Sequence, residues 1–425
     1  MLGLGTVGTG VARILMSNSE NLHVRAGGPL ELARVAVRSL DRPRDIELPA
    51  EMLTTDPEEI VRDPSLPILV ELIGCPGGST EPARRWILEA LQAGKHVVTA
   101  NKDVLAKHGP ELYRAAERYG GNLYFEAAVA GGIPVIKAIR ESLVGNEIRA
   151  MMGIINGTTN YMLTKMTREE APFEKVLAEA QALGYAEADP TSDVGGYDAA
   201  YKLAILASIA FETEVGVEDV YCEGITGITT EDIRNAAELG YVLKLLGIAK
   251  RTEAGVETRV HPTLIPETHP LAAVNDVFNA IFIEGDAVGE LMLYGRGAGM
   301  MPTGSAVVAD IVDAAINLRQ GVRGRLVKTQ RSLPTKPISE ISVRYYINLK
   351  VVDHPGVLGE IASTFGREHV SLESVIQKGR GQDPVSLVFI THEVKEKYVQ
   401  AALERVTQLP FVRGVTNVIR VEGAS

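Results

Sequence analysis

The pattern of apolar and polar residues along the chain changes character twice, near residues 134 and 322. In the first third, short apolar runs alternate with helical periodicity. Strands joined by crossover helices run in one direction, so this alternation predicts a parallel sheet. Strands are expected at 31–39, 67–74, 95–101 and 122–131, and a helix is expected over 80–95 with Thr80 as its N-cap.

A less regular pattern covers residues 134–302. Helical periodicity is present at 158–167, 173–183 and 198–211, and strand-like runs lie at 258–265 and 279–286. These elements predict a second domain of the α+β class. A further helical pattern ends this part of the chain, and we expect the helix at 303–321 to return to the first domain.

The C-terminal part begins with a basic, proline-containing segment. Residues 322–339 contain basic side chains and two prolines but no acidic side chain. We therefore expect residues 322–342 to form an exposed linker. Residues 343–425 then follow a β-α-β-β-α-β order, which is typical of a ferredoxin-like domain.

Composition narrows the class of partner. Of the 425 residues, 45% are hydrophobic and 23% are charged, as in an ordinary globular chain of two or three domains. A net charge of −11 argues against nucleic acid or an anionic membrane surface and leaves small molecules as the expected partners. Two cysteines, no bilayer-length apolar run and no signal peptide lead us to expect a cytoplasmic protein.

A glycine-rich string opens the chain and runs directly into a helical pattern. Its residues are Gly3, Leu4, Gly5, Thr6, Val7 and Gly8. In such strings the first glycine makes a tight turn, the second lets a pyrophosphate approach, and the third packs the helix on its strand. We therefore expect residues 1–133 to form a Rossmann-type domain that binds a dinucleotide. Only Met1 and Leu2 precede the string, so either the start is truncated or the first strand is a stub.

Two positions after expected strands indicate how the cofactor is used. Arg38 stands where an acid would bind the ribose hydroxyl of NAD, and an arginine there suits the 2′-phosphate of NADP. A solvated strand-end arginine is the alternative. Thr99 and Lys102 follow the apolar run at 95–98, at the carboxyl edge where open α/β sheets bind ligands. Lys102 either meets substrate or nicotinamide there, or is an ordinary surface lysine.

An acidic loop precedes the helix at 198–211. Four carboxylates lie between Gly184 and Lys202, namely those of Glu187, Asp189, Asp193 and Asp198. Asp-Pro and Gly-Gly pairs predict an irregular loop, and Asp198 and Lys202 are one helical turn apart on one face. They are thus expected to point together at the loop. The alternative is an N-cap with an ion pair worth about 0.3–0.5 kcal/mol.

Three more loops are candidates for binding. Gly157 and Thr158 lie at a helix start, where free N–H groups either cradle a carboxylate or are simply capped. Glu126 begins an irregular glycine loop whose carbonyl groups and carboxylate are hard ligands for a cation. The loop at 295–299 either passes close to the cofactor or forms a plain turn. No histidines are spaced as zinc ligands, and neither cysteine has the context of a nucleophile.

In this order, GLGTVG, TANK, the GGIP loop after Glu126, NGTTNY and GYAEADPTSDVGGYDAAYK resemble the homoserine dehydrogenase family over residues 1–321. Residues 352–358 resemble the corresponding segment of an ACT domain. The resemblance implies an NAD(P)-dependent oxidoreductase that interconverts L-aspartate 4-semialdehyde and L-homoserine. This reaction belongs to threonine, methionine and isoleucine biosynthesis.

The resemblance also implies a role for each candidate residue. Lys202 matches the proton donor, Asp198 would orient it, and Lys102 matches a second active-site lysine. Glu187 would bind the substrate ammonium, with Asp193, Gly157 and Thr158 lining the substrate site. Glu126 and the carbonyls of Val129, Gly131 and Ile133 would hold a structural, sodium-like ion. The cofactor positions are Gly3, Gly5, Thr6, Val7, Gly8, Arg38, Thr99, Lys102 and Gly299, with NADP favoured over NAD.

For the rest of the chain, the resemblance implies that residues 134–302 carry catalysis and form a homodimer. Asp353, Gly356, Val357 and Leu358 would bind an amino-acid effector, threonine being the first choice. The string ELIGCPGGSTEPA is longer than the turn usual in the family. Two other interpretations stay open, a non-catalytic sensor of amino acids or nucleotides and a related amino-acid dehydrogenase.

Overall fold

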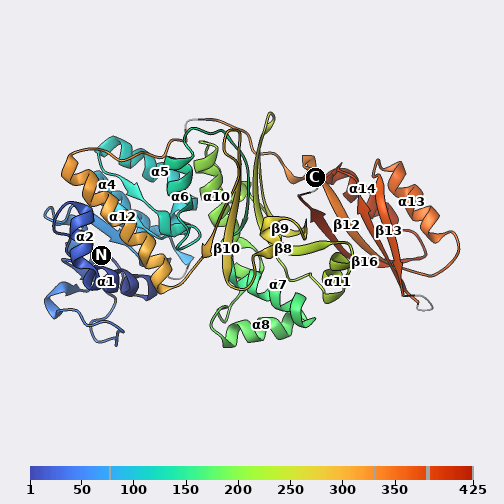
Figure 1. Cartoon of the computed structure of the whole chain (residues 1–425), viewed down its shortest axis with the longest axis horizontal. Coiled ribbons are helices and arrows are strands. Elements are labelled where there is room, and N and C mark those ends of the chain that lie inside the picture. The colour runs from blue at the N-terminus through green and yellow to red at the C-terminus, as the bar shows by residue number, and fades with distance from the viewer. Residues whose placement is uncertain (76–77, 330, 380–382, 424–425) are drawn as a thin grey trace. The chain divides into compact units, whose positions relative to one another are not determined.

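The computed structural model describes residues 1–75, 78–329, 331–379 and 383–423 (Figure 1). The chain forms two units. Unit 1 comprises Met1–Ala150, Tyr201–Asp219 and Asn279–Leu333, and unit 2 comprises Met151–Ala200, Val220–Phe278 and Pro334–Ser425. Strand β6 (Ile148–Ile154) and helix α10 (Tyr197–Ala210) contribute to both units. Within the described ranges, no helix combines the length and the apolar character needed to cross a membrane.

Unit 1 contains a parallel sheet with the strand order of dinucleotide-binding folds. Leu2 bridges Glu71 on one side and Ala36 on the other, and it is fully buried. In order of position, the sheet therefore runs through β2 (Leu53–Thr54), β1 (Val35–Ala36), Leu2, β3 (Ile68–Glu71), β4 (His96–Thr99) and β5 (Leu123–Tyr124). Counted along the chain this is the order 3-2-1-4-5-6. Met1 and Leu2 occupy the place of the first strand.

Helices pack in two groups around this sheet (Figure 1). One group is α1 (Thr6–Ser17), α2 (Ser19–Ala26) and α12 (Met300–Gln320), and the other is α3 (Pro57–Arg62), α4 (Glu81–Gln92) and α5 (Lys102–Tyr119). Helix α12 lies directly against α1, where a Cβ atom on Gly10 would be 2.3 Å from the carbonyl oxygen of Met300. The C-terminal helix of unit 1 thus packs on the glycine-rich start of the chain.

Some local predictions for unit 1 were wrong. The strand expected at 31–39 is reduced to β1, because its pairing partners, Leu2 and β2, are themselves only one and two residues long. The strand expected at 122–131 ends at Tyr124, and a 3-10 turn, η3 (Glu126–Ala128), follows it. Thr80 is the N-cap residue of α4, as predicted, but its side chain makes no cap hydrogen bond, because its hydroxyl bonds Nε2 of His108 at 3.0 Å.

The remaining elements of unit 1 are short or lie at its border. They are η1 (Ala50–Met52), α6 (Val135–Lys137), the π-helical turn η4 (Ala138–Ser142), η5 (Val217–Asp219), and the strands β10 (Phe278–Gly285) and β11 (Gly289–Arg296).

Unit 2 is built around a long antiparallel hairpin. Strands β8 (Tyr241–Thr252) and β9 (Gly255–Pro266) pair along all 12 residues of each. The other elements before the linker are α7 (Gly157–Glu169), α8 (Phe173–Ala182), α9 (Thr191–Val194), β7 (Tyr221–Cys222), α11 (Thr230–Glu238) and η6 (Pro270–Ala273).

The C-terminal part of unit 2 has the predicted ferredoxin-like order. It contains η7 (Ile338–Glu340), β12 (Ser342–Val351), α13 (Val357–Arg367), β13 (Leu372–Lys378), β14 (Val385–Thr391), β15 (Val394–Lys395), α14 (Glu396–Val406) and β16 (Val412–Val421). Its strands lie in the order β16-β12-β14-β13. Apolar side chains of α13 and α14 form one core with this sheet. Figure 1 shows both helices beside β12 and β13.

Two further contacts join this domain to the rest of unit 2. Strand β16 pairs in parallel with β9, so one sheet runs through both parts. On α11, Asp232 accepts hydrogen bonds from the Tyr346 hydroxyl at 3.0 Å, Asn348 at 3.2 Å and Asn417 at 3.0 Å. The ferredoxin-like domain is therefore packed into unit 2 through both backbone and buried polar contacts.

Candidate active site

The glycine-rich loop of unit 1 has the geometry of a dinucleotide site. Gly3 has φ +96°, and a Cβ atom there would lie 2.6 Å from the carbonyl oxygen of Leu72. A Cβ on Gly8 would lie 2.4 Å from the carbonyl oxygen of Gly3, whereas a Cβ on Gly5 would have no neighbour within 4 Å among the described residues. The open side of Gly5 lies at the N-terminus of α1, where N–H groups and the helix dipole favour an anion. These residues fit a bound pyrophosphate.

Basic side chains lie near this loop. Arg38 is exposed two residues after β1. Arg42 and Arg44 line a cavity of about 400 Å³ together with Leu4, and Arg44 donates hydrogen bonds to the carbonyls of Leu40 (3.1 Å) and Arg42 (2.9 Å). Sequence reasoning named Arg38 and missed Arg42 and Arg44, although basic residues directly after the strand were the available signal.

The carboxyl ends of β3 and β4 bring three polar residues together. Thr99, at the end of β4, donates a 2.6 Å hydrogen bond to the fully buried carboxylate of Glu71, at the end of β3. Asn101 caps α5 by accepting from the Val104 N–H at 3.3 Å. Lys102 is the first residue of α5, and its ammonium is 3.7 Å from Asp103. Glu71 was missed from the sequence, where the signal was a single charge ending an apolar strand.

Unit 1 also contains the part of α10 that carries Lys202. Tyr201 lies on α10, and its ring is 5.6 Å from the ammonium of Lys107 on α5. Leu105 and Ala106 of α5 line one small cavity with Ala204 and Ile205 of α10. Residues 105–107 of α5 are therefore adjacent to residues 201–205 of α10. Lys202 lies in this part of α10, and Lys102 lies one turn before this part of α5.

In unit 2, one asparagine joins the acidic candidates. Asn156 is the N-cap of α7, and its Oδ1 accepts from the Thr159 N–H at 2.9 Å. Its Nδ2 donates to Oδ1 of Asp193 at 2.7 Å and to Oδ2 of Asp198 at 2.8 Å. The starts of α7 and α10 and the short helix α9 are thus held at one point. Asn156 was not among the candidates, which included only the next two residues.

The loop before α9 places the other acidic residues. Glu187 is exposed, and its carbonyl accepts a hydrogen bond from Gln181 at 3.0 Å. Thr158 donates from its hydroxyl to the Tyr185 carbonyl at 2.8 Å. Asp189 accepts from both the N–H and the hydroxyl of Thr191, which lowers the pKa of Asp189 and forms the turn at Pro190. Asp189 therefore has a structural role, as predicted.

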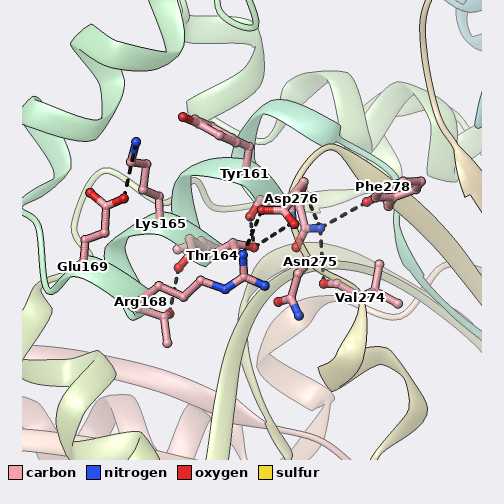
Figure 2. A network of polar contacts seen from close by, with 12 residues as sticks. Tyr161, Thr164, Lys165, Arg168, Glu169, Val274, Asn275, Asp276 and Phe278 are labelled. Carbon is pink, nitrogen blue, oxygen red and sulfur yellow. Dashed lines mark hydrogen bonds and ion pairs between the residues drawn. The ribbon is translucent and has the colours of Figure 1, made fainter.

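Polar side chains anchor the middle of α7 on the segment 274–278 (Figure 2). Thr164 accepts from the N–H of Asp276 at 3.0 Å, and Arg168 forms an ion pair with the Asp276 carboxylate at 3.2 Å. Asn160 donates to the carbonyls of Val274, Asp276 and Phe278 at 3.0–3.3 Å. These contacts fix the helix whose first turn carries Gly157 and Thr158.

A buried lysine completes this anchor. Lys244, on β8, donates from Nζ to the carbonyl of Val274 at 2.5 Å, to Oδ1 of Asn275 at 3.1 Å and to Oδ1 of Asn160 at 3.3 Å. Burial lowers the pKa of Lys244 to about 8. The sequence shows Lys244 only as one polar position in an apolar strand, so its partners could not be predicted.

The predicted cation loop has a different use for its carboxylate. Glu126 accepts hydrogen bonds from the N–H groups of Ile136 (2.8 Å) and Lys137 (2.7 Å), and burial raises the pKa of Glu126. The side chain thus holds the start of α6. In the described part of the chain, no three His, Cys, Asp or Glu side chains are placed to bind a metal ion. A cation in this loop would depend on the backbone carbonyl groups.

The loop at 295–299 is more than a plain turn. The Gly132 N–H donates to the Arg296 carbonyl at 3.1 Å, and a Cβ on Gly131 would lie 2.4 Å from the carbonyl oxygen of Gly297. Gly299 has φ +121° and precedes α12. The glycine loop after Glu126 and the loop at 295–299 are therefore in contact, which the sequence did not indicate.

The predicted effector residues surround the start of α13. Asp353 accepts a 2.9 Å hydrogen bond from Gln377 on β13. Gly356 adopts φ +92° before α13, Val357 is buried, and Leu358 is exposed. The start of α13 thus carries one polar group, the Asp353 carboxylate bonded to Gln377, and one exposed apolar group, the Leu358 side chain.

Comparisons with known proteins bear on the identity of this site. Residues 3–126 match the family model "Homoserine dehydrogenase, NAD binding domain", residues 134–312 match "Homoserine dehydrogenase", and residues 345–411 match "ACT domain". A homoserine dehydrogenase of Synechocystis sp. is 46% identical over 431 residues, which cover 99% of this chain and 98% of that protein. The chain belongs to the homoserine dehydrogenase family.

Other homoserine dehydrogenases agree. The enzyme of Bacillus subtilis is 44% identical, with coverage of 100% of this chain and 98% of that protein. The crystal structure of a homoserine dehydrogenase from Thiobacillus denitrificans has a TM-score of 0.92 and 45% identity, covering 99% and 97% of the two chains. A hyperthermophilic archaeal homoserine dehydrogenase in complex with NADPH has a TM-score of 0.63 and 27% identity, covering 77% and 98%.

The family assignment confirms the predicted fold class and enzyme class. The chain is an oxidoreductase of amino-acid biosynthesis with an NAD(P)-binding Rossmann domain, and its ACT domain implies amino-acid feedback. The turn at 71–83, which is longer than the turn usual in the family, includes residues 76–77 and so lies partly outside the described residues.

Proposed function

We propose that this chain reduces L-aspartate 4-semialdehyde to L-homoserine with NADPH, and that Lys202 supplies the proton. The observation that carries the proposal is the position of Asn156, which joins Asp193 and Asp198 at the start of α10, one turn before Lys202. Such an arrangement places carboxylates for a substrate ammonium near a lysine that can act as an acid.

The cofactor, when bound, supplies the hydride that is added to the aldehyde carbon. The glycine loop and the first turn of α1, through Gly3, Gly5 and Gly8, hold its pyrophosphate. Arg38, together with Arg42, binds the 2′-phosphate, which is the basis for proposing NADP over NAD. The nicotinamide side of the site is formed by Thr99 and Lys102, and Gly299 lies in a further loop assigned to the cofactor.

The substrate is an amino acid with an aldehyde side chain. Its α-ammonium and its α-carboxylate each need a partner of the opposite charge. Glu187 binds the α-ammonium, assisted by Asp193. Gly157 and Thr158, at the N-terminus of α7, bind the α-carboxylate through N–H groups that the helix dipole makes attractive to anions. Fixing both charged groups of the α-carbon orients the side chain that carries the aldehyde before reaction, which lowers the entropic cost of the reaction step.

Adding hydride to the aldehyde carbon leaves a negative charge on its oxygen. A lysine ammonium donates a proton to this oxygen and becomes neutral, so the product alcohol is formed without a free alkoxide. We assign this proton to Nζ of Lys202. Asp198 orients the ammonium of Lys202, and Asn156 holds the Asp198 carboxylate in one orientation. Lys102 stabilises the same developing charge from the start of α5.

The family resemblance supports the other parts of the proposal. Threonine binds at the ACT domain near Asp353, Gly356, Val357 and Leu358 and acts as a feedback effector. The enzyme works as a homodimer in the cytoplasm, where its two free cysteines stay reduced. A structural, sodium-like ion would be held mainly by the carbonyls of Val129, Gly131 and Ile133. Glu126, whose carboxylate also accepts from the Ile136 and Lys137 N–H groups, would be a further ligand.

A steady-state assay tests the central proposal. Purified protein is given L-aspartate 4-semialdehyde with NADPH or NADH, with and without threonine, and the loss of absorbance at the reduced nicotinamide band is followed. We expect semialdehyde-dependent oxidation that is faster with NADPH and that responds to threonine. Folded protein without turnover would contradict the assignment, and equal kcat/KM with both cofactors would contradict the preference for NADP.

A further inference from the structure

The buried carboxylate of Glu71 lies between the dinucleotide loop and the start of the helix that carries Lys102. Its side chain is fully buried, and it ends β3, the neighbour of Leu2 in the sheet. Its Oε2 accepts from the Thr99 hydroxyl at 2.6 Å, and its Oε1 accepts from the Ile73 N–H at 2.9 Å and from Nδ2 of Asn101 at 3.5 Å. Burying a carboxylate in a parallel sheet costs free energy unless hydrogen bonds or an ion pair compensate for the lost water.

The bonds from Glu71 determine which way the Asn101 amide faces. Nδ2 of Asn101 donates to Glu71 and to the Gly74 carbonyl at 3.2 Å, while Oδ1 accepts from the Val104 N–H at 3.3 Å and the Cys75 thiol at 3.3 Å. A rotated amide would place its NH₂ group against the Val104 N–H. Two acceptors on one end and two donors on the other therefore fix the cap of α5.

Thr99 closes the same network. Its hydroxyl donates to Glu71 and accepts from the Asn101 N–H at 3.0 Å. The backbone of Asn101 is thus held by Thr99 and its side chain by Glu71. Lys102 is the next residue, so the direction in which it leaves the sheet depends on this pair of contacts.

The carboxylate also holds the turn after β3. Oε1 fixes the N–H of Ile73, and the carbonyl oxygen of the preceding Leu72 is the atom that leaves room only for glycine at Gly3. Glu71 therefore contacts the backbone of the turn after β3 through Ile73 and the cap of α5 through the Asn101 side chain. Burial raises the pKa of Glu71, and the hydrogen bonds from Thr99, Ile73 and Asn101 oppose that shift.

We propose that Glu71 is a positioning residue of the reaction, which sets the start of α5 and thereby the place of Lys102 through Thr99 and Asn101. This inference rests on the proposed reaction. Glu71 touches neither substrate nor cofactor, and its effect is on the geometry of residues that do. A displacement of about 1 Å at a reacting group can cost about 100-fold in rate, so kcat is the quantity expected to respond.

The test compares Glu71→Gln, Thr99→Val and the double variant. Both substitutions keep the shape of the side chain, and each breaks the network at a different link. We expect kcat to fall at least 10-fold in each single variant. The Kd of NADPH from fluorescence titration should change less than threefold in Glu71→Gln, because Glu71 touches no cofactor. Since both variants release the same cap, the double variant is expected to be no slower than the slower single variant. Glu89→Gln, at a half-buried glutamate of α4 that pairs with Arg62 far along the chain from Thr99 and Asn101, is the control and should keep wild-type kcat.

The outcomes are distinguishable. If wild-type protein shows no turnover, the proposed reaction fails and the network is judged by NADPH binding alone. If wild-type protein is active and Glu71→Gln retains kcat within twofold, the positioning role is wrong. Fully additive losses in the double variant, or a Kd for NADPH that rises as much as kcat falls, would also overturn it. Should Glu71→Gln fail to fold, an unchanged kcat in Thr99→Val has the same meaning.

Discussion

Nδ2 of Asn156 donates a 2.8 Å hydrogen bond to Oδ2 of Asp198, which ties the cap of α7 to the first turn of α10. Replacing Asn156 by Ala removes this tie and the cap together. We expect kcat/KM for the semialdehyde to fall at least 10-fold, with the Kd of NADPH unchanged, because the disturbed residues belong to the substrate side. Steady-state kinetics and fluorescence titration measure the two effects.

Thr229→Ala is the matched control for this variant. Thr229 caps α11 through Asp232, and losing such a cap costs about 1 kcal/mol without involving Asp193 or Asp198. A similar loss of stability in both variants with a loss of kcat/KM only in Asn156→Ala would separate the two roles. Equal kinetic losses would show that Asn156 matters only for stability.

Lys202→Ala is expected to lower kcat by about 100-fold or more, since general acid catalysis contributes roughly 10²–10⁴-fold. Binding of NADPH should stay within threefold of wild type, because the cofactor is assigned to other residues. Lys397→Ala removes a lysine from an ion pair with Glu340 on another element and serves as the control. A Lys202→Ala enzyme with near-normal kcat would assign the proton to another group.

Arg42→Ala tests the choice between the two cofactors. Arg42 lines the cavity next to Leu4, and a charged hydrogen bond to phosphate is worth about 1.5–3 kcal/mol. We expect the KM for NADPH to rise about 10-fold and the KM for NADH to change less than twofold. Arg85→Ala, on the surface of α4, should leave both constants unchanged. A parallel rise for both cofactors would mean that Arg42 does not contact the 2′-phosphate.

Asp310 makes the stability of unit 1 depend on pH. Burial, together with the nearby Glu126 and Asp313 carboxylates, raises the pKa of Asp310 to about 8. An unfolded chain releases this proton near pH 4, so the folded state binds it more tightly and stability falls as pH rises from about 4 to about 8.

Asp310→Asn should therefore flatten the decline in thermal stability between pH 5 and pH 8 and raise the melting temperature above pH 7. The amide oxygen can still accept the 2.8 Å bond from the Glu126 N–H. Melting curves over this pH range check the effect against Asp45→Asn, at an exposed position. A variant with the wild-type slope would show that Asp310 does not titrate there.

Asp353→Asn tests the effector site. Asp353 accepts a hydrogen bond from Gln377, and its carboxylate is suited to an effector ammonium. We expect the concentration of threonine that gives half its effect to rise about 10-fold, measured by titrating the initial rate. Glu393→Gln, exposed on the same domain, is the control. An unchanged response to threonine would place the effector elsewhere.

The sequence predicted those parts whose residue types impose a local backbone. Glycines at Gly3 and Gly8 are required by close carbonyl oxygens, and Asp189 before Pro190 forms a turn in nearly any context. Helix α10 was placed within one residue, because its apolar run is long and its start is marked by Gly195 and Gly196. The order of the five motifs along the chain indicated the family.

Contacts between distant segments could not be predicted. Glu71 and Asn101 are 30 residues apart, and the carboxylate that receives the Glu126 N–H belongs to Asp310, 184 residues later. Strand lengths failed for the same reason. The strand at 31–39 has the right residues for a long strand, but a ladder extends only as far as its partner, and Leu2 and β2 are short.

The parallel pairing of β16 with β9 brings Glu422 into contact with Arg259, whose side chain is fully buried, and with Lys250 at 2.7 Å. The regulatory domain therefore shares a sheet and a buried ion pair with the rest of unit 2. Cutting the chain at the linker to obtain a feedback-free enzyme for metabolite production would remove Glu422 from Arg259, which would keep its ion pair with Glu257 at 2.9 Å, and would uncover the edge of β9 that β16 pairs with. Point changes in the effector loop are the safer route to such an enzyme, because they leave this shared sheet intact.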